Sequence, residues 1–549
     1  MTRKYCTIIC FILMLVTQLL IIVHFAEQKS GYDIDEIFSY GLANNNYGPT
    51  YNDIPQYYNH WHSSEVYKNY VTVQKNERFQ YGFVYHNQQL DVHPPLYYLL
   101  LHTVSSFFPN VFSKWIGLSL NFAGWVIMQI LLYLISRNVF KNYWLALLPC
   151  FFWGFSAAAI SLTLFIRMYA LLTCLTLLVT LIAFHVISHK KISLGLSLTL
   201  FLTVLVGFLT QYYFLIYLFF LSFAIAFILL IKKRWMNLLK CATCVILSIA
   251  SGLLIFPSAI HQILLNQRGQ QTRANFFDIS IFKQHLTQFN ALTNSQLYGG
   301  FLKPLVVFLL FSILIWLITH FFITRKVRFN REKQALSITT TRLTQNEIVS
   351  SLNQRIINFF ILLFTSIGYY LVVIKISPYQ VGRYVYPIFP QLALLTIYSL
   401  SLGIYVFCRN TRMVAGVLII LSIFTSLFGI GGKHIEIMNT YDKQITVAPQ
   451  YFKDDCLLVG LNKNVSKTNS IILQLLKYRR ILPTSDRHLD HISQAVLKPK
   501  GLTSSVIIYV NKDVDTQIVI NKVIKATSFN SMVKLPDTRF FHVYKISRE

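Results

Sequence analysis

The stretch LTLFIRMYALLTCLTLLVTLIAFHVI, residues 162–187, is apolar along most of its length, and its one formally charged residue is Arg167. A helix of about 17–25 such residues crosses the hydrocarbon core of a bilayer. The whole chain shares this character, since 54% of its 549 residues are hydrophobic and 13% are charged, about half the share in a soluble protein. These features predict an integral membrane protein.

Ten further apolar runs are long enough to span a bilayer, which gives eleven and predicts a polytopic α-helical membrane protein. The first run has a basic start, TRKY, without a small-residue cleavage site after it, which favours a retained anchor over a removed signal peptide. The second begins with a short re-entrant or interfacial piece, and its full span starts at about Trp115. The ten runs cover residues 7–25, 94–136, 143–160, 192–210, 212–231, 238–260, 302–323, 356–376, 386–407 and 413–432.

The net charge of +28 would indicate a nucleic-acid partner in a soluble protein. Here the basic residues gather in alternate loops, which the positive-inside rule places in the cytoplasm. We therefore expect no nucleic-acid partner, a multi-pass protein of the cell membrane with its N-terminus inside, and a C-terminal end outside. The basic segments are TRK near Met1, SRNVFK, SHKK, KKRW, residues 324–355 and CRNTR. The segment 324–355 is expected to lie against anionic lipid.

The acidic residues are the most informative feature outside the apolar runs. Eight of the 21 fall between Glu27 and Asp91, none follows before Asp278, and no predicted span contains one. A proton- or sodium-coupled transporter usually needs ionisable groups near the bilayer midplane, so this distribution disfavours that class. The stretch 26–92, here called the first loop, carries eight acids against four basic residues and is external in the predicted orientation. A loop of this length, rich in tyrosine, is expected to be ordered and functional.

Arginines in the other predicted outer loops supply the opposite charge. The planar guanidinium group suits phosphate oxygens. An acidic loop and several arginines on one membrane face therefore indicate a lipid-linked phosphate substrate. The alternative for each arginine is ordinary snorkelling at the bilayer interface. The arginines are Arg167, Arg268, Arg273 and Arg383.

Five motifs follow one another at the loops and span entrances of the predicted outer face. They are YDIDEIFSYGLAN after the first run, DVHPPLYYLLLH at the end of the first loop, IRMYALLTCLTLL, GFLTQYYFLIY and GRYVYPIFPQLALL. Together they resemble the GT-C membrane glycosyltransferases, and within them the bacterial branch similar to protein O-mannosyltransferases and aminoarabinose transferases. The resemblance covers about residues 1–432, and its sharper motifs are the Asp-Glu pair and the His-Pro-Pro corner.

This resemblance implies a transferase that uses a polyprenyl-phosphate sugar donor on the extracytoplasmic face, with a glycan, a lipid or a protein as the acceptor. In that family an aspartate of the first external loop serves as the catalytic base, which corresponds to Asp35 here, with Glu36 beside it. Related enzymes often have a histidine where this chain has Gln211, so the role of that histidine does not carry over. Some members bind a divalent metal ion in this region, for which Asp91 and His93 are the candidates; no other cofactor is expected.

The chemistry of these residues agrees with sugar transfer. A positioned carboxylate such as Asp35 takes the proton of an acceptor hydroxyl, and cations such as Arg167 and Arg383 stabilise the leaving phosphate. One displacement at the anomeric carbon inverts its configuration. The alternative function is a flippase or transporter of lipid-linked sugars, which binds the same lipid without bond chemistry. The candidate catalytic residues are Asp35, Glu36 and Asp91; the candidate substrate contacts are His93, Arg167, Tyr169, Gln211, Arg268, Arg273, Arg383 and Tyr384.

The same acids also have a purely structural interpretation. Asp33-Ile34-Asp35-Glu36 fits a capping box, with Asp33 as the N-cap and Glu36 three residues later. Asp91 fits the N-cap of a helix that starts at about Pro94, because proline suits the first helical turn. The corner at His93-Pro94-Pro95 is expected to anchor the end of the first loop at the membrane. It would hold Asp91 and His93 beside the acids near Asp35.

From about Ile435 the composition becomes that of a soluble domain. CLLVGL and SSVIIYVNK indicate strands, NSIILQLLKYRRIL and DTQIVINKVIKAT amphipathic helices, and MVKLPDTRFFHVYKI a closing hairpin. We therefore predict a GT-C like transmembrane catalytic domain over residues 1–432. A small extracytoplasmic α/β domain, here called the tail, follows over residues 433–549. Acceptor recognition, loop packing and structural support are all open as its role.

Overall fold

The computed structural model of the chain describes residues 2–278, 280–315, 342–436, 438, 445–492, 503–527 and 529–548. Two compact units make up the chain. The membrane unit comprises Met1–Ala26, Asn121–Leu164 and Met168–Glu436. The loop–tail unit comprises Glu27–Leu120, Phe165–Arg167 and Ile437–Glu549. Most of the predicted basic segment 324–355 lies outside the described residues.

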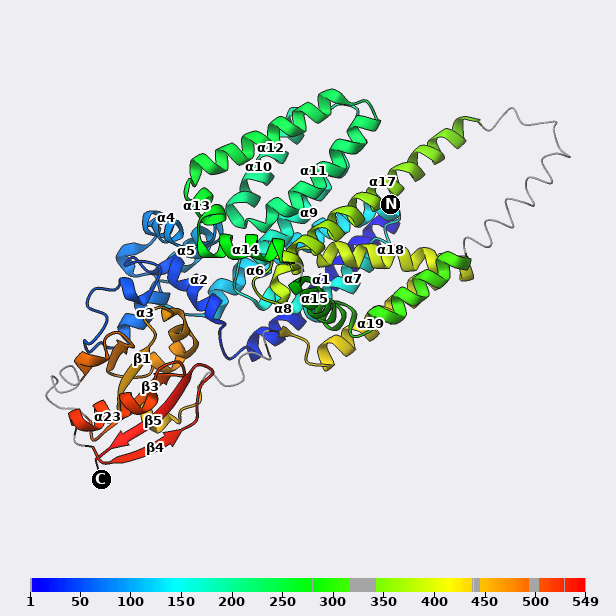
Figure 1. Cartoon of the computed structure of the whole chain (residues 1–549). Helices are drawn as coiled ribbons and strands as arrows, with labels where there is room; N and C mark the ends of the chain where they lie inside the picture. The colour runs from blue at the N-terminus through cyan, green and yellow to red at the C-terminus, as the bar shows by residue number, and fades with distance from the viewer. Residues whose placement is uncertain are drawn as a thin grey trace. The chain divides into compact units, whose positions relative to one another are not determined.

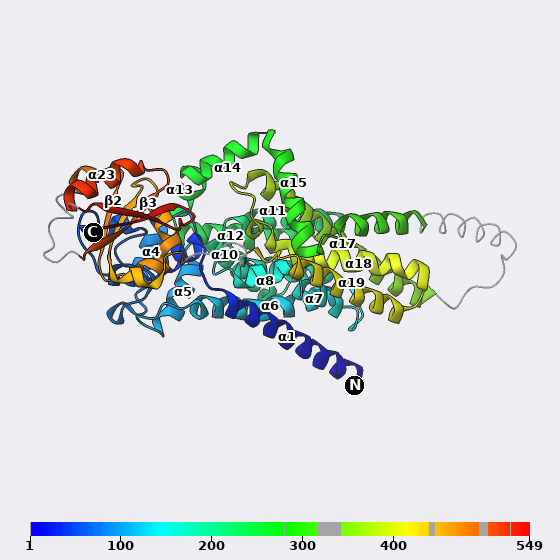
Figure 2. The ribbon, with the colours of Figure 1, turned by 90° about the horizontal axis from the view of Figure 1, so that it is seen from below.

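Long apolar helices build the membrane unit (Figures 1 and 2). Among the described residues, eight helices are long and apolar enough to cross a membrane, and two bent helix pairs raise the number to ten. The chain is therefore a polytopic α-helical membrane protein, as predicted. The eight helices are α1 (Thr2–Gln28), α6 (Lys114–Phe140), α9 (Tyr169–Ser188), α11 (Tyr213–Ile231), α12 (Trp235–Ile255), α17 (Arg342–Ile376), α18 (Phe389–Cys408) and α19 (Thr411–Gly431).

Three of the eleven predicted runs are not among these eight helices, and residues 316–323 of the run 302–323 lie outside the described residues. The helices α7 (Leu147–Gly154) and α8 (Ala157–Leu164) meet at 68°, and α15 (Ser280–Tyr298) meets the helix Leu302–Ile315 at 84°. The helix α10 (Leu194–Thr210) has 17 residues, the lower limit for a span. The eight full helices, the two bent pairs and α10 correspond to the eleven runs.

The predicted runs 143–160 and 162–187 are interrupted where the sequence analysis expected continuous helix. The first breaks before α8, where the Ser156 hydroxyl accepts a hydrogen bond from Ala159 N at 3.2 Å. In the second, α9 begins only at Tyr169, and Ile166 N donates to a glutamate side chain instead of a carbonyl of its own helix. The segment Phe165–Arg167 thereby groups with the loop–tail unit.

A proline ends the run predicted over residues 238–260. Pro257 follows the end of α12, and two short helices come next, α13 (Ser258–Leu264) and α14 (Gln267–Phe277). Proline lacks the N–H that would continue the helix. Two single turns, η3 (Gly382–Tyr384) and η4 (Tyr386–Ile388), precede α18.

The helices α9 to α12 lie side by side in the membrane unit (Figure 1). Of the candidate spans in the described residues, α9 is the most enclosed, with 83% of its apolar window buried against 11% in α12. The four helices surround a cavity of about 270 Å³ with an almost wholly apolar lining. Its walls include Val179, Ala183, Leu200, Leu221 and Val245.

The first loop is folded, as its aromatic content predicted. It forms the helices α2 (Ile34–Asn44), α3 (Glu65–Val71) and α4 (Tyr81–Leu90), with the single turns η1 (Tyr51–Asp53) and η2 (Lys75–Glu77). The helix α5 (Leu96–Ser106) follows. Buried tyrosines, which include Tyr51, Tyr67 and Tyr70, make its core. The rings of Tyr51 and Tyr70 lie 4.2 Å apart.

The tail contains a five-stranded sheet with the order β2-β1-β3-β5-β4 (Figure 1). The strands are β1 (Asp455–Gly460), β2 (Ile481–Ser485), β3 (Ser505–Asn511), β4 (Ser531–Leu535) and β5 (Phe541–Ser547). β1 pairs with β2 and β3 in parallel, and β5 pairs with β3 and β4 antiparallel. The predicted strands, the helix α23 (Thr516–Thr527) and the closing hairpin are all present.

The helix predicted over NSIILQLLKYRRIL is wrong for most of its length. The segment forms the turn η6 (Val465–Ile471), the four-residue helix α21 (Ile472–Leu475) and then the start of β2. Ile481 and Leu482 pair with Cys456 and Leu457 of β1, and this sheet pairing overrides the helical periodicity. Trp61 of the first loop packs against the core of the sheet. The contacts therefore group the first loop with the tail, a division different from the predicted boundary between residues 432 and 433.

Candidate functional site

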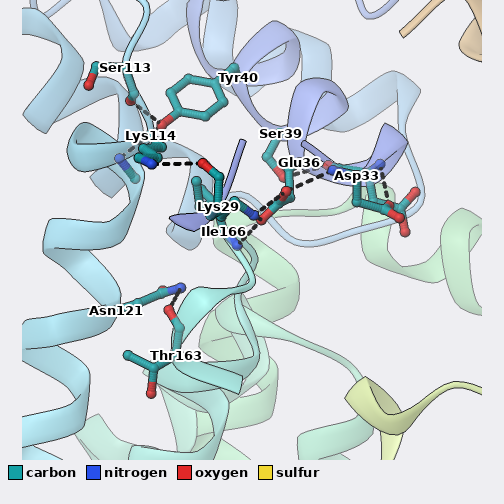
Figure 3. Close-up of polar contacts among 12 residues, drawn as sticks. Lys29, Asp33, Glu36, Ser39, Tyr40, Ser113, Lys114, Asn121, Thr163 and Ile166 are labelled. Atoms are coloured by element: carbon teal, nitrogen blue, oxygen red, sulfur yellow. Dashed lines mark hydrogen bonds and ion pairs between the residues drawn. The ribbon is translucent and has the colours of Figure 1, made fainter. Parts of the chain in front are cut away.

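Three acids stand at the start of α2, with Asp33 at the N-cap and Asp35 and Glu36 in the first turn, and two of them form its cap. Asp33 Oδ1 accepts a hydrogen bond from Asp35 N at 2.8 Å, and Glu36 Oε2 accepts one from Asp33 N at 2.8 Å (Figure 3). The capping box predicted from the sequence is therefore confirmed. The Asp35 side chain takes no part in it and is half-buried.

Glu36 is fully buried, and its carboxylate points toward Lys29 and Ile166 (Figure 3). Lys29 Nζ lies 2.7 Å from both carboxylate oxygens, and Ile166 N donates to Oε1 at 2.7 Å. Burial raises the pKa of the Glu36 carboxyl, while the Lys29 charge and the backbone N–H groups oppose that rise. Because these donors surround both of its oxygens, Glu36 holds structure together and is poorly placed to act as a base.

Arg167 is buried, and its guanidinium group reaches both α2 and α5. Nη1 donates hydrogen bonds to the backbone O of Asp35 at 3.3 Å and to Ser39 Oγ at 3.1 Å. Nη1 also donates to the Tyr98 hydroxyl at 3.2 Å, and Nη2 lies 3.4 Å from His93 Nε2. Asp35 and Arg167, which the sequence singled out 132 residues apart, are therefore in direct contact.

Asp91 and His93 form a pair at the predicted corner, with Asp91 Oδ2 3.0 Å from His93 Nδ1. When Nδ1 donates to this carboxylate, Nε2 becomes the acceptor that faces Arg167. The prediction that Asp91 caps the next helix is wrong. Asp91 is the C-cap of α4, where its backbone N–H donates to Gln88 O, and Pro95 occupies the N-cap position of α5.

Tyr98 and Ser39 are two members of this cluster that the sequence analysis did not single out. The only sequence signal for Tyr98 was its place in the DVHPPLYYLLLH motif. Burial raises the pKa of the Tyr98 hydroxyl, Arg167 opposes the rise, and the nearby carboxylates of Asp91 and Asp35 add to it. Tyr98 is therefore a neutral hydroxyl held against the guanidinium group.

The geometry does not fit the metal site for which Asp91 and His93 were candidates. Asp91 lies at one ring nitrogen of His93, and the Arg167 guanidinium lies at the other. A fixed positive charge at that distance repels a second cation. No group of three or more His, Cys, Asp or Glu side chains in the described residues is arranged to hold a metal ion.

In the membrane unit, the candidates Tyr169 and Tyr384 lie together. Their ring centroids are 6.3 Å apart, and Tyr213 packs on Tyr384 at 5.4 Å. Both candidate tyrosines are buried. The Arg383 guanidinium lies 5.5 Å from the ring centroid of Tyr384. Contact of these residues with a substrate stays a prediction.

The remaining candidates, Gln211, Arg268 and Arg273, also belong to the membrane unit. Gln211 is buried at the end of α10, and its side-chain oxygen accepts from the next backbone N–H at 2.6 Å. Arg268 Nη2 donates to the Tyr379 hydroxyl at 3.0 Å, and Arg273 Nη2 donates to the backbone O of Leu264 at 2.5 Å. Both arginines are exposed on α14, and their role stays a prediction.

The chain thus combines a multi-pass helical unit, a folded first loop with an acid in the first turn of α2, and a small α/β tail, which is the fold class predicted from the sequence. No protein family profile and no curated protein sequence matches the chain. Solved structures with a similar fold do match it.

The chain is similar to the crystal structure of ArnT from Cupriavidus metallidurans bound to undecaprenyl phosphate. The TM-score is 0.50 at 10% identity, and the match covers 96% of this chain and 97% of that chain. The apo state of ArnT matches with a TM-score of 0.47 at 12% identity, over 96% and 98% of the two chains. The archaeal oligosaccharyltransferase AglB from Archaeoglobus fulgidus, in complex with an inhibitory peptide and a dolichol-phosphate, matches with a TM-score of 0.45 at 12% identity, over 99% and 74%.

Proposed function

We propose that this protein is a membrane glycosyltransferase that moves a sugar from a polyprenyl-phosphate donor to an acceptor hydroxyl on the extracytoplasmic face. The observation that carries the proposal is the direct contact of the Arg167 guanidinium group with the backbone O of Asp35 in the first turn of α2. This contact brings together Asp35, the proposed base for the acceptor hydroxyl, and Arg167, the proposed cation for the donor phosphate. The fold that the chain shares with ArnT, crystallised with undecaprenyl phosphate, supports a lipid phosphate as the ligand.

In the proposed reaction, the acceptor oxygen attacks the anomeric carbon of the sugar. The bond between that carbon and the phosphate oxygen breaks, and its electron pair leaves with the phosphate. Asp35 takes the hydroxyl proton, while Arg167, which His93 faces through Nε2, stabilises the charge that develops on the phosphate. This single displacement inverts the anomeric configuration. Asp91 orients His93 through the contact at Nδ1.

The apolar cavity among α9 to α12 supports a lipid donor. Its lining residue Val179 lies ten positions along α9 from Tyr169, which corresponds to about 15 Å along a helix. We propose that part of the donor's isoprenoid tail occupies this cavity. Donors with short prenyl chains should then bind more weakly than long ones, and Ala183→Phe, which fills the cavity, should remove that difference.

The charge distribution supports the extracytoplasmic placement of the first loop and the tail, because the basic loops alternate with the loops that carry these groups. A reporter fused after Glu549 tests it. The expected result is activity of a reporter that works only outside the cytoplasm. Activity of a reporter that works only in the cytoplasm would show that the tail lies inside and would contradict the proposed orientation.

The decisive experiment replaces Asp35 with Asn, which keeps size and polarity but removes the base. Loss of a general base typically lowers turnover about 10²–10⁴-fold. Purified protein is incubated with polyprenyl-phosphate sugars and candidate acceptors, and the products are followed by mass spectrometry, with binding of polyprenyl phosphate measured in parallel. Asp35→Asn should abolish transfer and retain binding. The matched control is Asp33→Asn, because Asn also caps a helix and leaves Asp35 in place.

Two outcomes would overturn the proposal. Full transfer by the Asp35→Asn variant would show that Asp35 is not the base. Movement of the lipid-linked sugar across a vesicle membrane without any new glycosidic bond, unchanged by Asp35→Asn, would indicate the flippase alternative.

A further inference from the structure

The tail sheet has the topology in which α/β proteins usually bind ligands. Its parallel strands have the order β2-β1-β3, so the chain leaves β1 for a neighbour on one side and returns to β3 on the other. Ligands bind outside the carboxyl ends of such strands, where the strand order reverses. In this tail the order reverses between β1 and β3, whose carboxyl ends are Gly460 and Asn511.

A neighbouring crevice, at the carboxyl ends of β1 and β2, is filled by the chain's own first loop. Tyr57 and Tyr58 line it, opposite Gly460, Leu461 and Thr484. The space that remains is about 10 Å³. A volume of this size holds one water molecule at most. A separate sugar or peptide ligand therefore has no room there while the loop is in place.

Backbone hydrogen bonds attach the loop to the free edge of the sheet. Asn59 N donates to Pro483 O at 2.8 Å, and His62 and Ile481 exchange two bonds of 2.8 Å each. This antiparallel pairing covers the exposed edge of β2. It is the geometry by which sheets capture extended peptide segments.

Side chains add specific contacts on both sides of this pairing. The Tyr58 ring stacks on the His488 ring, with centroids 4.6 Å apart, and Asn59 Nδ2 donates to His488 O at 3.2 Å. Trp61 packs against the core of the sheet, with the Arg480 guanidinium 5.4 Å from its ring. The segment from Tyr57 to His62 is thus held by backbone, aromatic and cationic groups together.

We propose that the tail is a receptor for the first loop, and that the segment Tyr57–His62, here called the docking segment, is its intramolecular ligand. The turn η6 of the tail also packs on α2, the helix whose first turn contains Asp35. Docking thereby fixes the loop around the candidate base, a consequence that rests on the function proposed above.

Two variants of the full chain in detergent test the docking. His62→Pro removes the N–H that donates to Ile481 O, and Tyr58→Leu removes the ring that stacks on His488. Hydrogen exchange reports docking directly, since the Ile481 amide donates to His62 O. Both variants should speed exchange of the Ile481 amide at least tenfold and lower sugar transfer.

A control separates docking from general damage. Tyr47→Ala removes an exposed tyrosine of the same loop, outside the docking segment. This variant should leave exchange and transfer unchanged. Rapid exchange of the Ile481 amide in the wild-type protein, or unchanged exchange in His62→Pro, would overturn the docking. An inactive wild-type protein with a protected Ile481 amide would instead contradict the proposed function and leave the docking intact.

Discussion

Ile166 N donates a hydrogen bond of 2.7 Å to Glu36 Oε1, although the two residues are 130 positions apart. This contact ties the segment that carries Arg167 to the first turn of α2, which carries Asp35. Glu36 thus follows Asp35 in the sequence and binds the backbone N–H of the residue before Arg167. We interpret it as a positioning residue that sets the distance between base and guanidinium.

The first prediction concerns the buried pair of Glu36 and Lys29, whose side chains are fully enclosed. Glu36→Gln leaves the Lys29 ammonium buried without its counter-charge. Removal of one partner of a buried ion pair costs about 3–5 kcal/mol of stability. We expect a lower midpoint of thermal unfolding in detergent and slower sugar transfer.

The matched control for this pair removes both charges. Lys29→Met combined with Glu36→Gln should be more stable than Glu36→Gln alone, because no charge then stays buried unpaired. Transfer should stay slow in the double variant if Glu36 positions Ile166. Equal thermal midpoints for wild type and Glu36→Gln would contradict the interpretation.

The start of α2 illustrates what the sequence alone could predict. The capping box depends on residues three positions apart, so the DIDE spacing was sufficient to identify it. The bond from Ile166 N depends on a contact across 130 residues, for which a single sequence carries no pattern. The break before α9 was missed for the same reason.

Asp91 illustrates a local ambiguity. It stands between two helices, so the sequence could not decide whether it ends α4 or begins α5. The membrane helices were easier to predict, because span length and hydropathy depend on composition alone. In the tail, β2 was missed because a helical periodicity in its sequence is overridden by pairing with β1.

The second prediction concerns Arg167. Its Nη1 serves three acceptors at 3.1–3.3 Å while Nη2 faces His93, an arrangement that needs a planar fork. Arg167→Lys keeps the charge but cannot span these positions. We expect the affinity for polyprenyl phosphate, measured by titration calorimetry, to fall about tenfold or more, which corresponds to about 1.4 kcal/mol. The control Arg137→Lys changes an arginine that packs on Tyr143 in the membrane unit, and its affinity should match wild type.

The third prediction concerns the close approach of α6 to Ile166. A Cβ at Gly117 would lie 2.2 Å from Ile166 Cγ2 and 2.8 Å from the Tyr40 hydroxyl. Gly117→Ala should therefore displace the segment next to Arg167, with an overpacking penalty of about 1–3 kcal/mol. We expect a lower thermal midpoint and slower transfer.

A compensating change tests whether that clash is the cause. Ile166→Ala removes the Cγ2 atom, so Gly117→Ala combined with Ile166→Ala should transfer faster than Gly117→Ala alone. The control is Gly82→Ala in α4, where an added Cβ meets nothing within 4 Å. That variant should keep wild-type activity. A double variant slower than both single variants would point to a different cause.

The fourth prediction concerns His102, a fully buried residue of α5 whose ring meets the edges of Tyr81 and Phe83. Burial lowers the pKa of His102 below its usual 6.5, against the opposing effect of backbone groups at Ala43 and Glu77. The folded protein therefore binds this proton less readily than the unfolded chain does. Stability is highest above pH 6.5 and falls as the pH drops through 6.5 toward the folded-state pKa, because protons then favour the unfolded chain.

The measurement is the thermal midpoint of the full chain in detergent between pH 8 and pH 5.5. Wild type should lose stability on the acid side, and His102→Leu should show a shallower loss because it removes one of the groups that cause it. Part of the slope should persist, since burial also lowers the pKa of His62 in the docking segment. The control His86→Leu, at an exposed histidine of α4, should keep the wild-type slope. A wild-type slope in His102→Leu would exclude His102 as a source of the acid sensitivity.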